Sequence, residues 1–304
     1  MAAPSIAVTR VAPRASHGLW GDALRRLLRN RPAMVGAMLI VAFLIVAVFA
    51  PFLAPYPPNE SFPPPPGATT QKLGPWPPSA AHPFGQDKQG RDELSRVMYG
   101  ATVSLLAGMS SVIVGVTLGG LIGAVAGAAG GKVDSLLMRC VDVLLAMPGI
   151  LLAIGIVTFL GQGLWQITIA VAITNAPIFA RLLRGGLLSV RESDYVLASR
   201  SIGASSRRLL TKHMLPNSLT PIIVAATLAL ATAIIDIAGL GFLGLGPPDP
   251  RTPEWGTMLT DAREFLRSAA YLIFFPGIAI VITAVGFNLL GDGLRESLDP
   301  RLRR

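Results

Sequence analysis

Charged residues are scarce in this sequence of 304 residues, of which only 14% are Asp, Glu, Lys or Arg. A water-soluble domain of this length usually carries about 25% charged residues. Hydrophobic residues make up 52% of the chain, and long stretches contain no charge at all. This composition excludes an ordinary soluble domain and predicts an all-α integral membrane protein.

Cysteine and histidine are also rare. Cys140 is the single cysteine, so no disulfide can form within the chain. His17, His82 and His213 are far apart, and the sequence has no HExxH motif and no paired Cys/His spacing. We therefore expect no metal site and no bound cofactor in this chain.

A phosphate-binding loop of the form GxxxxGK[ST] is missing as well. The nearest string, AGAAGGKVDS, has Ala126 in place of the first glycine and Val133 in place of Ser or Thr. Without that glycine and hydroxyl, the loop would not cradle nucleotide phosphates and Mg²⁺. No Ser/His/Asp or paired-carboxylate arrangement stands in a plausible site either, so we expect no enzymatic activity in this chain.

Long apolar segments are what the sequence has in abundance. A helix that crosses a bilayer needs about 20 predominantly apolar residues. One uncharged run, Val143–Ala180, is too long for one helix, and the glycines of FLGQGLW at 159–165 favour a turn that divides it. The six predicted spans are Ala33–Leu53, Ala101–Gly131, segments near 140–159 and 165–183, Ser218–Leu240, and Ala269–Leu290. The first span is longer than a signal-peptide core, so we interpret it as an uncleaved helix.

Basic residues divide unequally between the two sides of these spans. With the N-terminus in the cytoplasm, 19 of the 26 Lys and Arg lie on the cytoplasmic side, as the positive-inside rule requires. The net charge of +9 therefore reflects membrane topology, and we expect no nucleic-acid partner. This orientation puts both termini and residues 181–216 in the cytoplasm. Residues 241–268 and the proline-rich residues 55–100 lie outside, and we expect 55–100 to be an extended loop with little regular structure.

Residues 193–216 are charged and amphipathic although they lie between apolar spans. We expect two short helices here. Ser193 caps the first and Gly203 ends it in a left-handed conformation, while Ser205 starts the second and Pro216 breaks the chain before the next span. Their apolar and small residues need a cover, which is either another protein or the membrane surface.

The string YVLASRSIGASSRRLLTKHMLPN, residues 195–217, resembles the EAA loop of permease subunits of ABC importers. That signature has the form E-A-A-x-x-x-G followed by an end similar to I-x-L-P. Leu197 replaces its glutamate here and Ser199 its second alanine. The resemblance implies a coupling loop, residues 190–216, that docks on a cytoplasmic ATPase. The residues that it assigns to the coupling are Tyr195, Leu197, Ala198, Ser199, Arg200, Gly203, Ala204 and Pro216.

Other segments resemble the C-type permeases of the peptide/nickel importer family. They are RNRPAMVGAMLIVAFLIVAVFAPFLAPYPP, HPFGQDKQGRDELSRVMYGATVSLLAG and GDGLRESLDPRLRR, and IIDIAGLGFLGLGPPDPRTPEWGTML is similar to the dipeptide branch. The resemblance implies six transmembrane helices in the type I importer permease fold. It divides the chain into a cytoplasmic N-terminal tail (1–32), a first helix with a proline-rich outer loop (33–100), a five-helix transmembrane domain (101–291) and a cytoplasmic C-terminal tail (292–304).

The same resemblance implies location and partners. It places the chain in the bacterial cytoplasmic (inner) membrane, among lipid. A homologous second permease, two ABC ATPases that use ATP and Mg²⁺, and an extracytoplasmic substrate-binding protein are the expected partners. Dipeptides or short peptides are the expected cargo, with nickel chelates, glutathione or oligopeptides as alternatives. An ion-coupled secondary transporter is a further alternative, although such proteins usually show internal repeats and buried charges. A structural or sensory membrane protein is another alternative, but it would leave the cytoplasmic loop unexplained.

Glycines recur every four residues in the second predicted span, at Gly115, Gly119, Gly123, Gly127 and Gly131. Four residues overshoot a helical turn by about 40°, so we expect this stripe to wind around the helix. Small residues let helices approach closely. We interpret the stripe as tight packing, and a sliding contact during gating is the alternative.

Asp236 is the only acid that we place inside a span, close to the outer boundary. It either anchors the α-amino group of a peptide or is a solvated or paired structural acid. Pro148, early in the third span, forms either a hinge or a static kink. Residues 241–268 form an outer gate, a docking surface for a binding protein, or a re-entrant loop with Trp255 at headgroup level.

Overall fold

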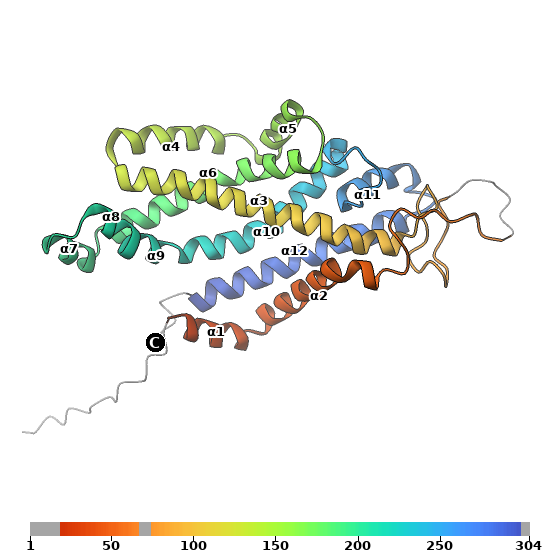
Figure 1. The fold of residues 1–304 in the computed structure, drawn as a ribbon, viewed down its shortest axis with the longest axis horizontal. Helices are drawn as coiled ribbons and strands as arrows, with labels where there is room; N and C mark the ends of the chain where they lie inside the picture. Colours follow the sequence, from red (N-terminus) through yellow and green to blue (C-terminus); the bar gives the residue numbers. More distant parts are fainter. Residues whose placement is uncertain (1–18, 67–73, 299–304) are drawn as a thin grey trace, which may run out of the picture.

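The computed structural model describes residues 19–66 and 74–298, and it consists mainly of long helices that run along one axis (Figure 1). Those parts of the two predicted tails and of the proline-rich loop that fall on residues 1–18, 67–73 and 299–304 lie outside the described residues. Within the described ranges no β-strand forms, and only isolated bridges occur in the loop before α3. The predicted all-α architecture is confirmed.

Fifteen helical elements follow one another in these ranges. In chain order they are α1 (Leu19–Arg29), α2 (Arg31–Leu53), α3 (Glu93–Ala129), α4 (Gly131–Leu145), α5 (Gly149–Leu160), α6 (Leu164–Arg191), α7 (Asp194–Ser201), α8 (Ser206–Arg208), the π-helix η1 (Leu209–Met214), α9 (Leu215–Ser218), α10 (Thr220–Leu240), the π-helix η2 (Gly241–Leu245), α11 (Trp255–Ala262), the 3₁₀-helix η3 (Arg263–Phe265) and α12 (Tyr271–Leu298).

Five of these segments are long and apolar enough to cross a membrane: α2, α3, α6, α10 with η2, and α12. A sixth span exists if α4 and α5 count as one, and these two helices are bent by 94° at residues 146–148. The predicted number of six is therefore reached only with a broken third span. The prediction of one helix near 140–159 is wrong, because a proline at 148 cannot continue the hydrogen bonds of α4.

Several helices are longer than predicted. α3 begins at Glu93, because the Asp92 side chain caps it and accepts a hydrogen bond from Ser95 N at 2.8 Å. The expectation of an irregular loop up to residue 100 is therefore wrong for residues 93–100. α6 continues to Arg191, and α12 continues through residues 292–298 of the predicted C-terminal tail.

The closest helix contact joins α3 to α6 through the glycine stripe. A Cβ atom on Gly119 would collide with the carbonyl oxygen of Ala176, and one on Gly123 would collide with that of Ala180. Gly115 and Gly127 also face α6. α6 follows the stripe, because the carbonyl oxygens that Gly115, Gly119 and Gly123 meet, those of Ala172, Ala176 and Ala180, are also four residues apart. The missing side chains let the two backbones touch.

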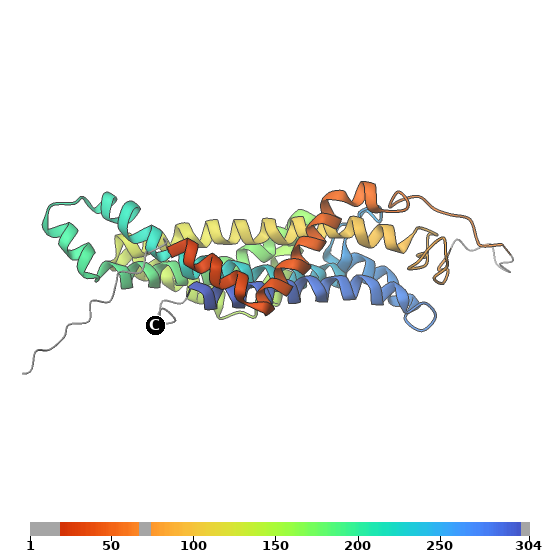
Figure 2. The same ribbon diagram turned by 90° about the horizontal axis from the view of Figure 1, so that it is seen from below.

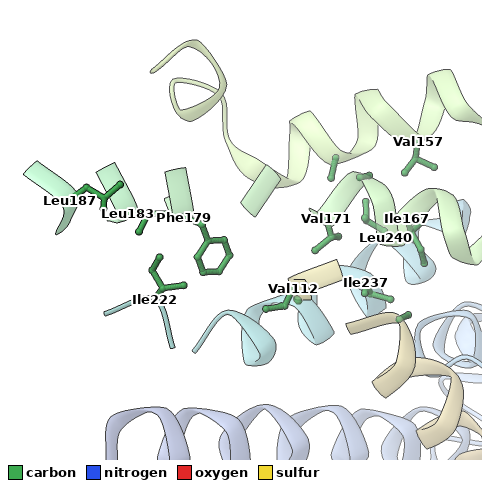
Figure 3. Close-up of a cluster of buried hydrophobic side chains, with 14 of the residues drawn as sticks. Val112, Val157, Ile167, Val171, Phe179, Leu183, Leu187, Ile222, Ile237 and Leu240 are labelled. Atoms are coloured by element: carbon green, nitrogen blue, oxygen red, sulfur yellow. The ribbon is translucent and has the colours of Figure 1, made fainter. Parts of the chain in front are cut away.

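The main apolar cluster lies between α6 and its neighbours (Figure 3). Phe179, Leu183 and Leu187 of α6 are almost fully buried, and Val157 of α5 packs on the outer part of the same helix. A second cluster joins α2, α3 and α12 around Trp255 of α11.

The two ends are built differently. α7 and α8 form one end, beyond the long helices (Figures 1 and 2). Residues 55–66 and 74–92, together with α11, form the other end (Figure 1). We call residues 55–66, 74–96 and 246–262 the outer cap.

Candidate functional site

The predicted coupling loop is held to the bundle by a few apolar side chains. Val196 of α7 is fully buried and belongs to the main apolar cluster, as do Leu209 and Met214 of η1. Ala204 packs against the same cluster and is only partly buried. One side of α7 is therefore fixed, and the other side is left to the solvent.

Several apolar side chains of α7 are exposed to the solvent. Tyr195 and Leu197 are each 45% exposed, and Ile202 at the end of the helix is 87% exposed. Ala198 and Arg200 are exposed between them. Ser199 is half-buried, and its Oγ donates to the carbonyl of Tyr195 at 2.7 Å. Because this hydroxyl donates within its own helix, Ser199 has no free donor for a partner, and only its oxygen lone pairs remain to accept.

Gly203 ends α7 in the left-handed region, as predicted, with a φ of +88°. Nothing lies within 4 Å of the position of a Cβ atom there, so conformation alone requires glycine. Gly203 N donates to Arg200 O at 3.0 Å and Ala204 N donates to Ser199 O at 3.1 Å. These bonds satisfy the last carbonyls of α7 and turn the chain toward α8.

Two of the predicted local signals differ from the structure. Ser193 does not cap α7 with its side chain, because its Oγ donates instead to Val190 O at 2.6 Å. Pro216 does not break the helix before the next span, because it stands in the first turn of α9, where no N–H is needed. Ser205 does cap α8, and its Oγ accepts from Arg208 N at 3.4 Å.

Asp236 lies in α10, about 24 Å from the start of that helix at Thr220. Its carboxylate is partly buried and has no hydrogen bond or ion pair with any residue of the described ranges. Gly239 is one turn further on, and a Cβ atom there would lie 4.0 Å from Ile150 Cδ1 at the start of α5. Asp236 therefore lies on the side of α10 that approaches the broken third span.

Asp236 is not the only acid within a candidate span, which corrects the prediction. Asp142 of α4 forms an ion pair with Arg181 of α6 at 2.6 Å, and Asp134 pairs with Arg184. The prediction overlooked Asp142, which lies within the predicted span near 140–159, and it treated residues 131–140 as a loop, whereas they belong to α4. Asp236 differs from these acids in having no basic partner among the described residues.

Pro148 lies between two separate helices rather than inside one. It is the N-cap residue of α5, and Leu151 N and Leu152 N donate to its carbonyl at 3.0 Å and 3.1 Å. The 94° bend therefore has ordered hydrogen bonds on its α5 side. Its role as a hinge stays a prediction.

The outer cap contains a buried charge network that the sequence interpretation missed. Arg91 forms an ion pair with Asp87 at 2.6 Å and donates to Pro250 O at 2.8 Å. Arg96 donates to Pro250 O at 3.2 Å and to Pro58 O at 3.1 Å. Both arginines are at least 96% buried. They bind the proline-rich loop, the start of α3 and the segment after α10 into one unit. A signal was present, since the string DKQGRDELSR, residues 87–96, concentrates charge directly before an uncharged run.

Glu254 and Trp255 complete the outer cap. Glu254 is fully buried, caps α11 through bonds from Gly256 N and Thr257 N, both at 2.8 Å, and faces Ser104 Oγ at 3.4 Å. Burial raises the pKa of the Glu254 carboxyl to about 7. Trp255 is fully buried, and its Nε1 donates to Val97 O at 3.0 Å. The interpretation of Trp255 as a residue at headgroup level is therefore wrong.

Comparison with sequence families gives two matches. Residues 119–304 match the family described as binding-protein-dependent transport system inner membrane component. Residues 18–71 match the N-terminal transmembrane domain of oligopeptide transport permease C. Between them the two matches include α2, most of the helical core and the candidate coupling loop.

Curated relatives cover nearly the whole chain. The dipeptide transport system permease protein DppC of Alkalihalophilus pseudofirmus is 44% identical over 284 residues, which are 93% of this chain and 90% of the relative. The di/tripeptide transport system permease protein DppC of Pseudomonas aeruginosa is 42% identical over 280 residues, 90% of this chain and 89% of the relative. The glutathione transport system permease protein GsiD of Escherichia coli is 43% identical over 284 residues, 93% of this chain and 91% of the relative.

A solved structure shares the fold. A chain in the structure titled "Inward facing conformations of the MetNI methionine ABC transporter" aligns with a TM-score of 0.56 and 21% sequence identity. The alignment covers 67% of this chain and 96% of that chain. At this identity the likeness concerns the fold alone.

Proposed function

Since this chain belongs to the family of binding-protein-dependent transport system inner membrane components, we propose that it is the permease subunit through which an ATP-driven importer moves dipeptides or short peptides. Two relatives above 40% identity carry dipeptide or di/tripeptide transport in their names, which supports this cargo. The chain itself has no phosphate-binding loop, so ATP and Mg²⁺ would be used by partner ATPase subunits.

The assembly that we propose has the composition of a type I importer. A second, homologous permease pairs with this chain, two ABC ATPases dock at the cytoplasmic end, and a binding protein delivers peptide from outside. The chain lies in the inner membrane, and the bias of Lys and Arg supports cytoplasmic termini. In this orientation the outer cap faces the binding protein. The division of the chain at residues 32, 100 and 291 stays part of this proposal.

One observation supports the ATPase contact above the others. α7 exposes the apolar side chains of Tyr195, Leu197 and Ile202, while Val196 fixes the helix to the bundle. An apolar face that protrudes beyond the membrane spans gains stability only when another surface covers it. We propose that a cleft on the ATPase covers it, and that ATP-driven closure moves α7 and the helices fixed to it. The small Ala198 and Ser199 would then allow close approach.

The first test of this proposal combines cargo and coupling. In a host strain without this gene, uptake of a radiolabelled dipeptide should fall, and the wild-type gene should restore it. Ala198→Asp should not restore uptake, because it places a charge in the proposed contact, although the permease should still reach the membrane. Ala270→Asp, an exposed alanine at the opposite end, is the matched control and should restore uptake.

Each outcome has a distinct meaning. If Ala198→Asp assembles and transports normally, α7 is not the docking helix. If dipeptide uptake is unchanged in the deletion strain, and that strain has no second dipeptide system, the dipeptide assignment is wrong while the family membership stands. Radiolabelled glutathione is the second cargo to test, because the glutathione permease relative is 43% identical.

We further propose that Asp236 lies on the substrate path and binds the α-amino group of the peptide. The carboxylate is partly buried, lies within a span and has no partner in the described ranges, and such a group is costly unless water or a cation reaches it. Asp236→Asn should raise the KM for dipeptide uptake at least tenfold. For a peptide whose α-amino group is acetylated, the wild type and the variant should have the same KM. Unchanged kinetics would remove Asp236 from the path.

A further inference from the structure

α1 is joined to the first membrane span by a single residue. Asn30 stands between α1 and α2, and its Oδ1 accepts from Ala33 N at 3.1 Å as the cap of α2. Its Nδ2 donates to Glu296 Oε2 of α12 at 2.7 Å. Because α2 begins at Arg31 and crosses the membrane, α1 has no linker with which to leave the membrane surface. Figure 2 shows the bend at which α1 and α2, both red, meet.

One side of α1 packs on the protein and the adjoining side does not. Leu27 approaches α12, where a Cβ atom on Gly293 would lie 3.4 Å from Leu27 Cδ1. Leu24 and Leu28 are each 56% exposed. At about 100° per residue, these two leucines lie next to each other and continue the apolar arc that Leu27 begins. The residues whose side chains the structure describes leave this arc uncovered.

Two arginines border the uncovered leucines. Arg25 and Arg29 are exposed, and they are four residues apart, so they form a row beside the row of Leu24 and Leu28. Neither arginine has an ion pair with any residue whose side chain the structure describes. A row of leucines beside a row of arginines, in a helix that lies along a membrane surface, matches a lipid interface in which acyl chains meet headgroup phosphates.

We propose that α1 is a binding site for anionic phospholipid, with Leu24 and Leu28 in the acyl boundary and Arg25 and Arg29 on the headgroup phosphates. Continuity with α2 fixes the helix at the depth where these groups meet. The partner is a lipid rather than a protein because α1 continues directly into the span α2, which holds the exposed leucines and arginines at the membrane surface. This inference does not depend on the cargo.

Fluorescence quenching in the assembled importer tests the site. The single cysteine, Cys140, is first replaced by serine, and Leu28→Cys is labelled with an environment-sensitive fluorophore. The importer is reconstituted in nanodiscs with either brominated phosphatidylglycerol or brominated phosphatidylcholine at equal mole fraction. We expect quenching in both, and stronger quenching by phosphatidylglycerol. Ser268→Cys, exposed in the outer turn before α12, is the aqueous control and should stay unquenched.

Charge variants then test the arginines. Each arginine near an anionic surface contributes roughly fivefold to lipid preference. Arg25→Gln with Arg29→Gln should therefore abolish the preference for phosphatidylglycerol, while Arg25→Lys with Arg29→Lys should retain most of it. Arg251→Gln with Arg267→Gln, both exposed at the other end, is the matched control and should leave the preference unchanged.

Three results would overturn the proposal. A label at residue 28 that is not quenched shows that water or another subunit covers α1. Equal quenching by the two lipids shows that the surface does not select anionic headgroups. An anionic preference that survives the double glutamine variant shows that other residues provide it.

Discussion

The outer cap and the coupling loop lie at the two ends of one bundle and differ in which side chains they bury and which they expose. In the outer cap, Arg91 and Arg96 are buried and their partners lie in the same chain, on Asp87 and on the carbonyls of Pro58 and Pro250. In the coupling loop, three apolar side chains are exposed, and basic residues such as Arg207 and Arg208 have no ion pair among the described residues. The outer end hides its charges, and the inner end displays its apolar groups.

This difference indicates which end is complete without partners. Burying a charge is unfavourable unless it is paired and hydrogen-bonded, and Arg91 and Asp87 meet that condition within the chain. An exposed apolar helix gains nothing from water. We infer that the outer cap is a fixed structural unit of the chain, whereas α7 reaches its stable state only against another subunit.

The largest expected effect comes from breaking the outer cap. Arg91→Ala removes the 2.6 Å ion pair of the buried Asp87 carboxylate, leaving only Arg96 at 3.6 Å, and it removes one of the two arginine donors to the Pro250 carbonyl. Removing one member of a buried pair costs about 3–5 kcal/mol. Thermal unfolding of the purified permease in detergent should show this as a clear loss of stability. Arg207→Ala, an exposed arginine of the coupling loop, is the control and should change stability by less than about 0.5 kcal/mol. If both variants unfold like the wild type, the cap network does not stabilise the chain.

A second prediction concerns the pH dependence of the outer cap. Burial raises the pKa of Glu254 from its ordinary 4.5 to about 7. The folded chain therefore holds a proton that the unfolded chain releases above pH 4.5, so stability should fall as pH rises from about 4.5 to about 7 and then level off. The loss is on the order of 3 kcal/mol.

Glu254→Gln tests this directly, because glutamine does not titrate. Thermal unfolding in detergent measures the stability of both proteins between pH 5 and pH 7.5. As the pH rises through this range, we expect the wild type to lose stability relative to the variant. The comparison of the two proteins isolates Glu254 from other titrating groups. Parallel pH curves for the two proteins would mean that Glu254 keeps the same charge throughout this range.

The contrast between the ends also explains what the sequence predicts well. Spans and the break at 161–163 follow from apolar runs and paired glycines, which act locally. Gly203 and Ser205 were assigned correctly because left-handed backbone and N-caps depend on adjacent residues. The sequence also showed the glycine stripe of α3. It did not show that all of these glycines contact α6, since the four-residue spacing of α6 becomes relevant only once the two helices touch.

The missed features depend on contacts between distant segments. Arg91 and Pro250 are 159 positions apart, and no local pattern shows that one donates to the other. One of the three interpretations of residues 241–268 placed Trp255 at headgroup level, but α3 provides a pocket beside Gly100 and an acceptor at Val97 O. The helices can therefore be predicted from local composition. The polar network of the outer cap cannot, because it forms only when distant segments come together in the folded chain.

The smallest expected effect on stability concerns the turn after α7. Gly203→Ala places a side chain at a φ of +88°, where nothing lies within 4 Å, so only the backbone cost of about 1 kcal/mol applies. Since α7 is fixed mainly through Val196, we expect local loosening with no change in global unfolding, and faster hydrogen exchange in α7. A cost of this size lowers the population of the ordered turn about fivefold, so uptake should fall by up to that factor.

Two further variants sharpen this test. Gly203→Asn should have a smaller effect than Gly203→Ala, because asparagine tolerates the left-handed region better than alanine. Gly161→Ala, at the other end of the bundle, imposes a backbone cost at least as large, because its φ of +91° and ψ of 170° lie in a region that is essentially restricted to glycine, also with nothing within 4 Å. If uptake falls with Gly203→Ala and not with Gly161→Ala, the order of α7 itself limits transport, as expected of an end that is completed by a partner. Equal losses in both would mean that transport responds to backbone strain anywhere in the chain, and the distinction between a complete and an incomplete end would lose its functional meaning.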